Sequence, residues 1–180
     1  MSKQEAKTKS QSNLDFKLMA LTYKLRDFLR PRMNILEEAG IKSCFQVLDY
    51  GCGPGSYVVP VIKLIGNIGT LYALDVNPLA IKAVQSPASK KGISNVRVIL
   101  SDCDTGLPPD SIDVVLLYDI LHDLENRTKV LTELRRVLKP EGILSVSDHH
   151  LKEEEIISGI TGGGLFKLSV KGKKTYSFSK

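Results

Sequence analysis

The 180-residue sequence has no tryptophan, three cysteines and no run of 18 apolar residues. Without such a run a membrane-spanning helix is excluded, and the first ten residues lack the apolar core of a secretory signal. We therefore expect a cytoplasmic protein. Cys44, Cys52 and Cys103 are odd in number and lack C-x-x-C spacing, which argues against a disulfide framework and a zinc knuckle. Reduced cysteines are the expectation.

The composition, 42% hydrophobic and 25% charged residues, fits one globular domain. The net charge is +5, and the excess of lysine is concentrated near the two ends of the chain. The lysines concerned are Lys3, Lys7 and Lys9 at the start, and Lys167, Lys171, Lys173, Lys174 and Lys180 at the end. Solvated lysines that protect a sheet edge are favoured over a phosphate-binding surface, since no aromatic-interleaved RNA-binding motif accompanies them. A nucleic acid partner stays open but is not favoured.

The first 40 residues precede the first strand and predict a polar tail followed by two helices. Residues 1–13 lack periodicity, whereas Leu14, Leu18, Leu21, Leu25 and Phe28 recur at the spacing of an amphipathic helix. Pro31 suits the start of a second helix that ends at Gly40. These helices either pack over the sheet or form a lid over the substrate. We expect residues 1–40 to cap a single domain formed by residues 41–180.

From residue 45 onward, strand patterns alternate with helix patterns. The expected strands cover residues 45–50, 71–75, 95–100, 112–117 and 142–147, and the expected helices cover 57–65, 78–91 and 128–138. A turn is expected at 139–142. After a short helix at 153–158, residues 165–170 and 175–179 predict a closing β-hairpin. This alternation predicts an α/β fold with a doubly wound, mostly parallel sheet and an antiparallel C-terminal hairpin. Ligands bind such sheets at the carboxyl ends of the strands.

The segment from Val47 to Tyr57 is the strongest functional signal. Its strand runs directly into Gly51, Gly53 and Gly55, and a helix follows. Glycines at these positions let a ligand lie against the backbone. The dinucleotide-binding fingerprint G-x-G-x-x-G requires glycine at position 56, where this chain has serine. Asp49, two residues before the loop, would repel a pyrophosphate and attract an ammonium or sulfonium group, so a nicotinamide oxidoreductase is disfavoured.

An acidic residue followed by G-x-G-x-G resembles the first motif of class I S-adenosylmethionine-dependent methyltransferases. The segment Leu131-Thr-Glu-Leu-Arg-Arg-Val-Leu-Lys-Pro-Glu-Gly142 resembles the later helix and turn of that family. The likeness covers roughly residues 45–180 and is closest to the small-molecule methyltransferases of ubiquinone and menaquinone biosynthesis. It implies a seven-stranded Rossmann-like fold, adenosylmethionine as methyl donor and adenosylhomocysteine as product.

The resemblance also implies a set of cofactor-binding residues. Asp75 ends the second strand, where a carboxylate accepts hydrogen bonds from ribose hydroxyls. Asp102 and Cys103 occupy the place that recognises the adenine. The full set is Asp49, Gly51, Cys52, Gly53, Gly55, Asp75, Val76, Asp102, Cys103 and Tyr118. The Asn/Asp-Pro-Pro-Tyr motif of enzymes that methylate amide or exocyclic amino nitrogen is replaced by Tyr118-Asp-Ile-Leu121, which disfavours those substrates.

Three histidines, His122, His149 and His150, follow expected strand ends. Methyl transfer from a sulfonium needs alignment and, for a phenol, thiol or acidic carbon, removal of a proton. His149 and His122 are therefore the candidate catalytic bases. The alternative is that all three are structural. A metal site would require the rings to converge, and without supporting ligand spacing none is expected.

The sequence thus favours an enzyme that methylates a small molecule. Two alternatives remain open: a cofactor-binding subunit without catalysis of its own, and an RNA methyltransferase that uses the basic C-terminal hairpin. The oligomeric state and the acceptor are not specified by these patterns.

Overall fold

The computed structural model describes residues 16, 18, 20–22, 33–90 and 92–180. The expected tail, Pro31 and most of the expected helix over residues 14–28 lie outside the described residues. Within that helix, Phe16 is buried, whereas Leu18 and Leu21 are exposed, so the expected apolar face is not buried at these two positions. The part of the chain that is described contains no helix long and apolar enough to cross a membrane.

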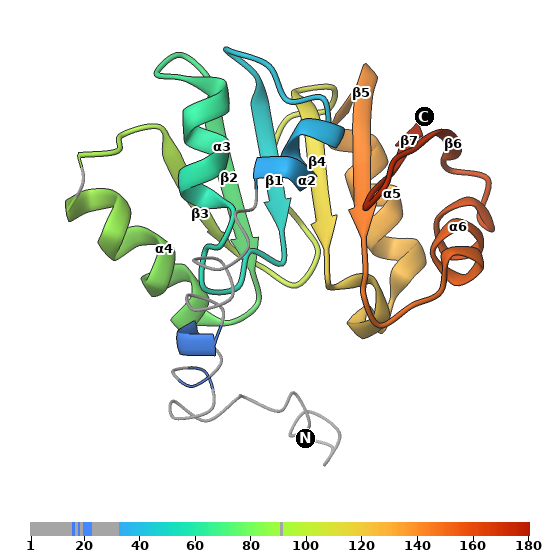
Figure 1. Ribbon diagram of the computed structural model, residues 1–180, viewed down its shortest axis with the longest axis horizontal. Coiled ribbons are helices and arrows are strands. Elements are labelled where there is room, and N and C mark those ends of the chain that lie inside the picture. Colours follow the sequence, from blue (N-terminus) through green and yellow to red (C-terminus); the bar gives the residue numbers. More distant parts are fainter. Residues whose placement is uncertain (1–15, 17, 19, 23–32, 91) are drawn as a thin grey trace.

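Seven strands form one sheet (Figure 1). They are β1 (Gln46–Tyr50), β2 (Thr70–Asp75), β3 (Val96–Leu100), β4 (Ile112–Tyr118), β5 (Leu138–Ser147), β6 (Lys167–Lys171) and β7 (Tyr176–Ser179), in the spatial order β3-β2-β1-β4-β5-β7-β6. Strands β1 to β5 pair in parallel, and β7 pairs antiparallel with both β5 and β6. The predicted doubly wound sheet with an antiparallel hairpin is confirmed.

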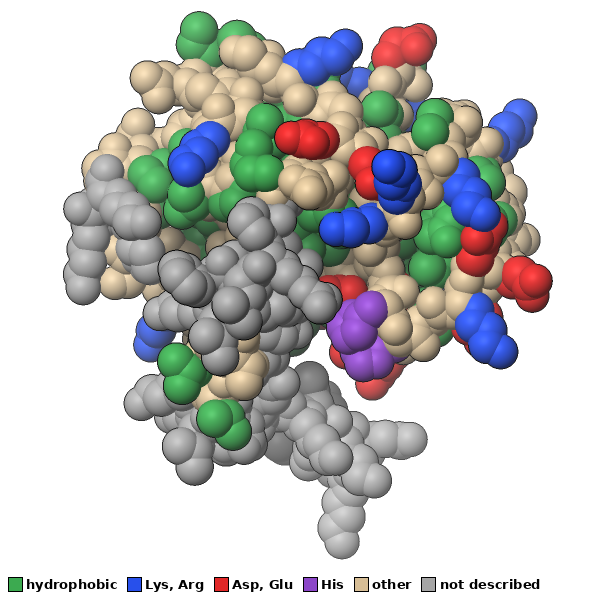
Figure 2. Space-filling model, viewed as in Figure 1, with side chains coloured by type: hydrophobic (Ala, Val, Ile, Leu, Met, Phe, Trp, Pro, Cys, Tyr) green, Lys and Arg blue, Asp and Glu red, His purple; other side chains and the backbone are tan. Residues whose placement is uncertain are grey.

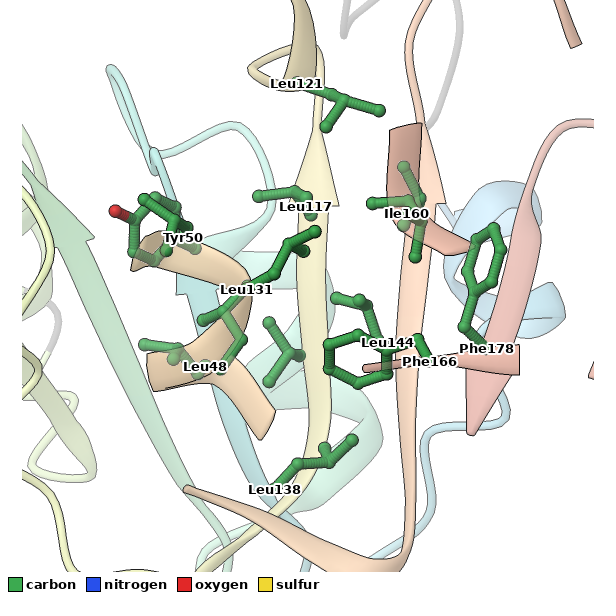
Figure 3. Packing of buried hydrophobic residues seen from close by; sticks show 14 of the residues in the cluster. Leu48, Tyr50, Leu117, Leu121, Leu131, Leu138, Leu144, Ile160, Phe166 and Phe178 are labelled. Carbon is green, nitrogen blue, oxygen red and sulfur yellow. The ribbon is translucent and has the colours of Figure 1, made fainter. Parts of the chain in front are cut away.

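Helices cover both faces of the sheet because strand residues alternate in direction. On β1, Val47 belongs to a core shared with α2 (Met33–Glu38), α3 (Val58–Ile65) and α4 (Pro78–Lys90). Its neighbour Leu48 belongs to a second core with α5 (Arg127–Val137) and α6 (Glu153–Thr161), drawn in Figure 3. Both cores contain fully buried aliphatic side chains from β1 and β4. These two strands therefore form the packed centre of the sheet, and the loops that follow them start from it.

Several boundaries differ from the sequence-based expectation, most clearly that of β5. The turn expected over residues 139–142 lies within β5, which begins at Leu138. The register with β4 shifts from Ile112 opposite Leu138 to Val114 opposite Ile143, so the extra residues form an irregularity in a continuous strand. Pro140 lacks an N–H group, and such bulges accommodate proline within a sheet. The expected helix at 153–158 also extends further, to Thr161.

The basic C-terminal hairpin forms the edge of the sheet. All residues of β6, the outermost strand, are exposed, as expected for lysines that protect a sheet edge. Lys171 forms an ion pair with Glu153 at 2.7 Å, and Lys180 pairs with Asp110. Acidic partners therefore neutralise part of the basic excess, which weakens the case for a phosphate-binding surface.

The carboxyl ends of the parallel strands meet at one edge of the sheet, where their arrowheads point in Figure 1. Strand β1 lies between β2 and β4, and the chain reverses its direction of winding there. Open α/β sheets bind ligands in the crevice outside this switch point. The loops that follow β1, β2, β4 and β5 are therefore the place to look for a site.

Candidate active site

The loop after β1 is held against β2 by its backbone. The N–H groups of Gly51 and Cys52 both donate to the carbonyl of Leu74, at 2.8 and 2.9 Å. Gly51, Gly53 and Gly55 have φ angles of 78°, 50° and 86°, a left-handed region that residues with a Cβ rarely adopt. The three glycines thus permit a tight turn directly at the tip of the strand.

The space around each glycine distinguishes the glycines that packing requires from the one that borders a possible ligand. A Cβ at Gly51 would lie 2.9 Å from Ile120, and one at Gly55 would lie 3.1 Å from Val84. A Cβ at Gly53 would meet no described residue within 4 Å. Gly51 and Gly55 are therefore required by their neighbours, whereas Gly53 borders open space, as expected where a ligand approaches the backbone.

Asp49 is the most unusual acidic residue of the site. It is 2% exposed, and its Oδ2 atom has no hydrogen-bond partner among the described residues. Burial, together with the nearby charge of Asp75, raises the pKa of Asp49 to about 7. A buried carboxylate without a partner is costly. A cationic ligand at the loop would supply the missing partner.

Asp75 ends β2 and reaches the same loop. Its Oδ2 accepts from the N–H of Gly53 at 2.8 Å, and its Oδ1 accepts from the N–H of Asn77 at 2.8 Å. Burial raises the pKa of Asp75, although these backbone hydrogen bonds oppose the shift. The sequence indicated a ribose-binding acid at this position but not its contact with the glycine loop. Val76, which follows it, is exposed beside the loop.

The other expected cofactor residues divide into exposed and buried groups. Asp102 is exposed, and its carbonyl accepts from the hydroxyl of Tyr50 at 2.8 Å, which ties the loop after β3 to β1. The side chains of Cys52 and Cys103 are buried in opposite cores. Tyr118 is also buried, with its hydroxyl 2.8 Å from that of Ser145. These three side chains contribute packing, and their contacts with a cofactor stay predictions.

His122 lies in a short 3-10 helix, η1 (Leu121–Asp123), after β4, and it is bound to the tip of β5. Its Nδ1 is 2.8 Å from Oδ2 of Asp148, and its backbone N–H donates to the same oxygen at 3.1 Å. Burial alone would raise the pKa of Asp148, but hydrogen bonds from His122 and from the N–H of His150 outweigh it and lower that pKa. Asp148 is therefore an ionised carboxylate, and in this form it holds the His122 ring.

His149 and His150 complete a cluster at the same edge. Nδ1 of His149 lies 2.8 Å from Oδ1 of Asp119, the residue after β4. The His150 ring centre is 4.2 Å from that of His122 and 3.9 Å from that of His149. The three imidazoles form one patch bordered by acidic side chains (Figure 2). Sequence reasoning found the histidines but missed Asp119 and Asp148; the signal was an acid directly after each of two neighbouring strands.

Comparison with known proteins decides the family. A family model described as a methyltransferase domain matches residues 41–173, most of the chain. The chain belongs to the methyltransferase-domain family. The family expected from the glycine loop and from the helix before β5 is thereby confirmed.

Similar proteins of this family include two quinone-pathway enzymes. The chain is 26% identical over 139 residues to a ubiquinone/menaquinone biosynthesis C-methyltransferase of Marinomonas sp. (strain MWYL1), covering 76% of this chain and 55% of that protein. It is 26% identical over 119 residues to a demethylmenaquinone methyltransferase of Geobacillus stearothermophilus, covering 66% and 51%. The chain thus spans about half the length of these curated relatives.

Among solved structures, a SAM dependent methyltransferase from Aquifex aeolicus matches this methyltransferase domain over most of both chains. The TM-score is 0.74 at 25% identity, and the match covers 89% of this chain and 97% of the other. A protein of nearly the same extent therefore adopts the same fold.

Proposed function

We propose that this methyltransferase-domain protein binds S-adenosylmethionine and transfers its methyl group to a small-molecule acceptor. The observation that carries the proposal is the buried carboxylate of Asp49, whose Oδ2 has no hydrogen-bond partner among the described residues, beneath a loop whose Gly53 borders open space in the described part of the chain. Adenosylmethionine carries an ammonium and a sulfonium group, and either cation would favour an ionised Asp49. The anionic pyrophosphate of NAD would meet repulsion at the same place.

The residues of the two neighbouring strands suit the rest of this cofactor. Asp75 accepts from the backbone N–H groups of Gly53 and Asn77, and a carboxylate has about four acceptor positions, so it keeps capacity for a ribose hydroxyl. The exposed Asp102 and the backbone of Cys103 lie at the end of the next strand, where we expect the adenine. When bound, the cofactor supplies a methyl group already activated on sulfur.

The chain itself supplies a candidate for proton removal. A carboxylate only accepts hydrogen bonds, so the contact with Asp148 places a proton on Nδ1 of His122, and Nε2, which lies 3.5 Å from Oδ2 of Asp123, is the ring atom that can take up a further proton. This is the arrangement of an oriented general base. His149, held by Asp119, is the second candidate, and its ring is more exposed than that of His122.

The names of similar proteins and the ion pairs of the C-terminal lysines support a small-molecule acceptor. Two of the similar proteins are methyltransferases of quinone biosynthesis, and a third is a nocamycin O-methyltransferase of Saccharothrix syringae. Such carbon and oxygen acceptors lose a proton around methyl transfer, which fits a histidine held by a carboxylate. The ion-paired lysines of the hairpin favour a small molecule over RNA.

Calorimetry with adenosylhomocysteine, adenosylmethionine and NADH tests the cofactor. We expect the two adenosyl compounds to bind with one site per chain and NADH to bind much more weakly. Radiolabelled adenosylmethionine, offered with phenols, quinol precursors and RNA, then tests the acceptor. Preferential binding of NADH would overturn the proposal. Tight adenosylhomocysteine binding without transfer to any acceptor class would instead favour a cofactor-binding subunit.

A further inference from the structure

The acid-histidine cluster has a property beyond proton transfer. One potential ligand atom from each of Asp119, Asp148 and His149 lies within 4.8 Å of the other two. The centre of such a triangle is at most about 2.8 Å from each atom, and small side-chain movements would reach the bond lengths of about 2.0 to 2.2 Å that transition metals require. We propose that these three residues bind a divalent transition-metal cation of the Mn²⁺ or Zn²⁺ class, a site that is additional to the cofactor pocket.

The ligands come from rigid and adjacent parts of the sheet. Asp119 directly follows β4, and Asp148 and His149 directly follow β5. The two strands pair up to their last residues, Tyr118 opposite Ser147, and the N–H of Asp119 donates to the carbonyl of Ser147 at 2.7 Å. The backbone positions of the three residues are therefore set by the paired strand ends, which favours a preorganised site.

The charge state of the cluster suits a cation. Asp148 is buried, and its two carboxylate oxygens accept hydrogen bonds from the backbone N–H groups of His122 and His150. A carboxylate oxygen of Asp119 lies within 4.8 Å of one of Asp148, and both lie within that distance of a ring nitrogen of His149. Two carboxylates in one place favour a cation, and a divalent ion compensates both at once.

The surroundings resemble the outer shell of a metal site. The His122 ring and the N–H of His150 donate to Asp148 and fix the orientation of its carboxylate. Ligating carboxylates and imidazoles are commonly held in this way. One imidazole with two carboxylates favours Mn²⁺ or Zn²⁺ over Mg²⁺, which rarely takes a nitrogen ligand from protein.

Three protein ligands leave coordination positions open, as in catalytic rather than structural metal sites. An oxygen of the methyl acceptor could occupy one of them, and the cation would lower the pKa of that oxygen. In the metal-bound protein His149 is a ligand, so the role of base falls to His122. This last step rests on the proposed methyl transfer, whereas the binding of the ion does not.

The site is tested by titrating MnCl₂ and ZnCl₂ into chelator-treated protein in a calorimeter, without adenosylmethionine or acceptor. We expect one ion per chain for at least one of the two metals. Asp119→Asn and His149→Ala should each weaken that binding by about 100-fold or more, and His122→Ala, which alters only the outer shell, by about tenfold. Glu154→Gln removes an exposed acid from the first turn of α6 and should leave binding unchanged.

Two results would overturn the proposal. One is that folded wild-type protein binds neither metal stoichiometrically. The other is that Asp119→Asn and His149→Ala, shown by circular dichroism to be folded, bind the metal like the parent. Adenosylhomocysteine affinity, measured in excess chelator, reports the cofactor pocket separately, so failure of the metal site and failure of the proposed methyltransferase function are distinguishable.

Discussion

Asp49 and Asp148 are both buried aspartates at the carboxyl ends of parallel strands, yet their environments act in opposite directions. They are 2% and 5% exposed. Burial and the charge of Asp75 raise the pKa of Asp49 to about 7, whereas hydrogen bonds from His122 and from the His150 backbone lower the pKa of Asp148. Burial is the main cause of the raised pKa of Asp49, whereas at Asp148 the hydrogen-bond partners outweigh the effect of burial.

The same contrast separates the two halves of the site. At the β1–β2 end, the Asp75 carboxylate accepts from backbone N–H groups and Oδ2 of Asp49 has no partner among the described residues, which is why we propose a cationic ligand there. At the β4–β5 end, carboxylates and imidazoles already pair with one another. We therefore expect the first region to control cofactor binding and the second to control chemistry, and substitutions should affect one without the other.

The largest effect is expected for Gly53→Val, which should abolish adenosylhomocysteine binding measured by calorimetry. The valine side chain would fill the open space that borders Gly53, and the φ angle of 50° is strained for a β-branched residue. Because none of the described residues lies within 4 Å of the added Cβ, the variant should still fold.

Gly92→Val is the matched control for that substitution. Gly92 also has a positive φ, 65°, and an added Cβ would meet nothing within 4 Å, but it lies at the opposite end of β3 from the glycine loop. It should share the backbone strain of about 1 to 2 kcal/mol and keep adenosylhomocysteine binding. Parent-like binding by Gly53→Val would mean that the loop is only a structural turn.

The next effect concerns His122→Ala at the other end of the site. With an identified acceptor, turnover should fall by about 10²- to 10⁴-fold, while cofactor affinity changes by no more than a few-fold, since proton removal belongs to the transition state. His149→Ala tests the second candidate in the same assay. If both variants turn over at near-parent rates, the histidines are structural and the acceptor arrives already nucleophilic.

The glycine loop and the acid-histidine cluster also differ in how far the sequence could predict them. Strands, helices and the glycine loop followed from periodicity and glycine spacing, because these patterns are local. The pairing of His122 with Asp148 joins residues 26 positions apart, and that of His149 with Asp119 joins residues 30 apart. Such contacts depend on β4 and β5 being neighbours in register. The bulge in β5 was missed for a related reason: Pro140 and Gly142 have the local signature of a turn, but the strand pairs with β4 on both sides of them, at Leu138 and again from Ile143.

A smaller effect on binding is expected for Asp75→Ala. Loss of charge-assisted hydrogen bonds to two ribose hydroxyls should weaken adenosylhomocysteine binding by about 1.5 to 3 kcal/mol. The variant also frees the N–H of Gly53, so part of the loss would come from a less ordered loop. Asp75→Asn keeps one side-chain oxygen as a hydrogen-bond acceptor, so its loss of adenosylhomocysteine affinity should be smaller. An unchanged dissociation constant for a folded Asp75→Ala variant would remove Asp75 from the site.

The smallest expected effect is a pH dependence of stability in the ligand-free protein, caused by Asp49. Because its pKa is raised in the folded state to about 7, the folded protein retains a proton that the unfolded chain has lost. Stability therefore falls as pH rises from the unfolded pKa, about 4, and levels off above pH 7. Asp75, whose pKa is also raised, contributes in the same direction.

Asp49→Asn isolates the contribution of Asp49, since asparagine does not titrate and Asp75 remains in place. Urea unfolding at pH 5.5 and pH 7 should show that the stability difference between the variant and the parent shifts in favour of the variant by roughly 1 to 2 kcal/mol at the higher pH. Saturating adenosylmethionine should reduce this shift, because its cations stabilise the ionised carboxylate in the parent alone. A stability difference that is constant with pH would show that Asp49 is already ionised and paired, and the argument for a cationic ligand beneath the glycine loop would lose its basis.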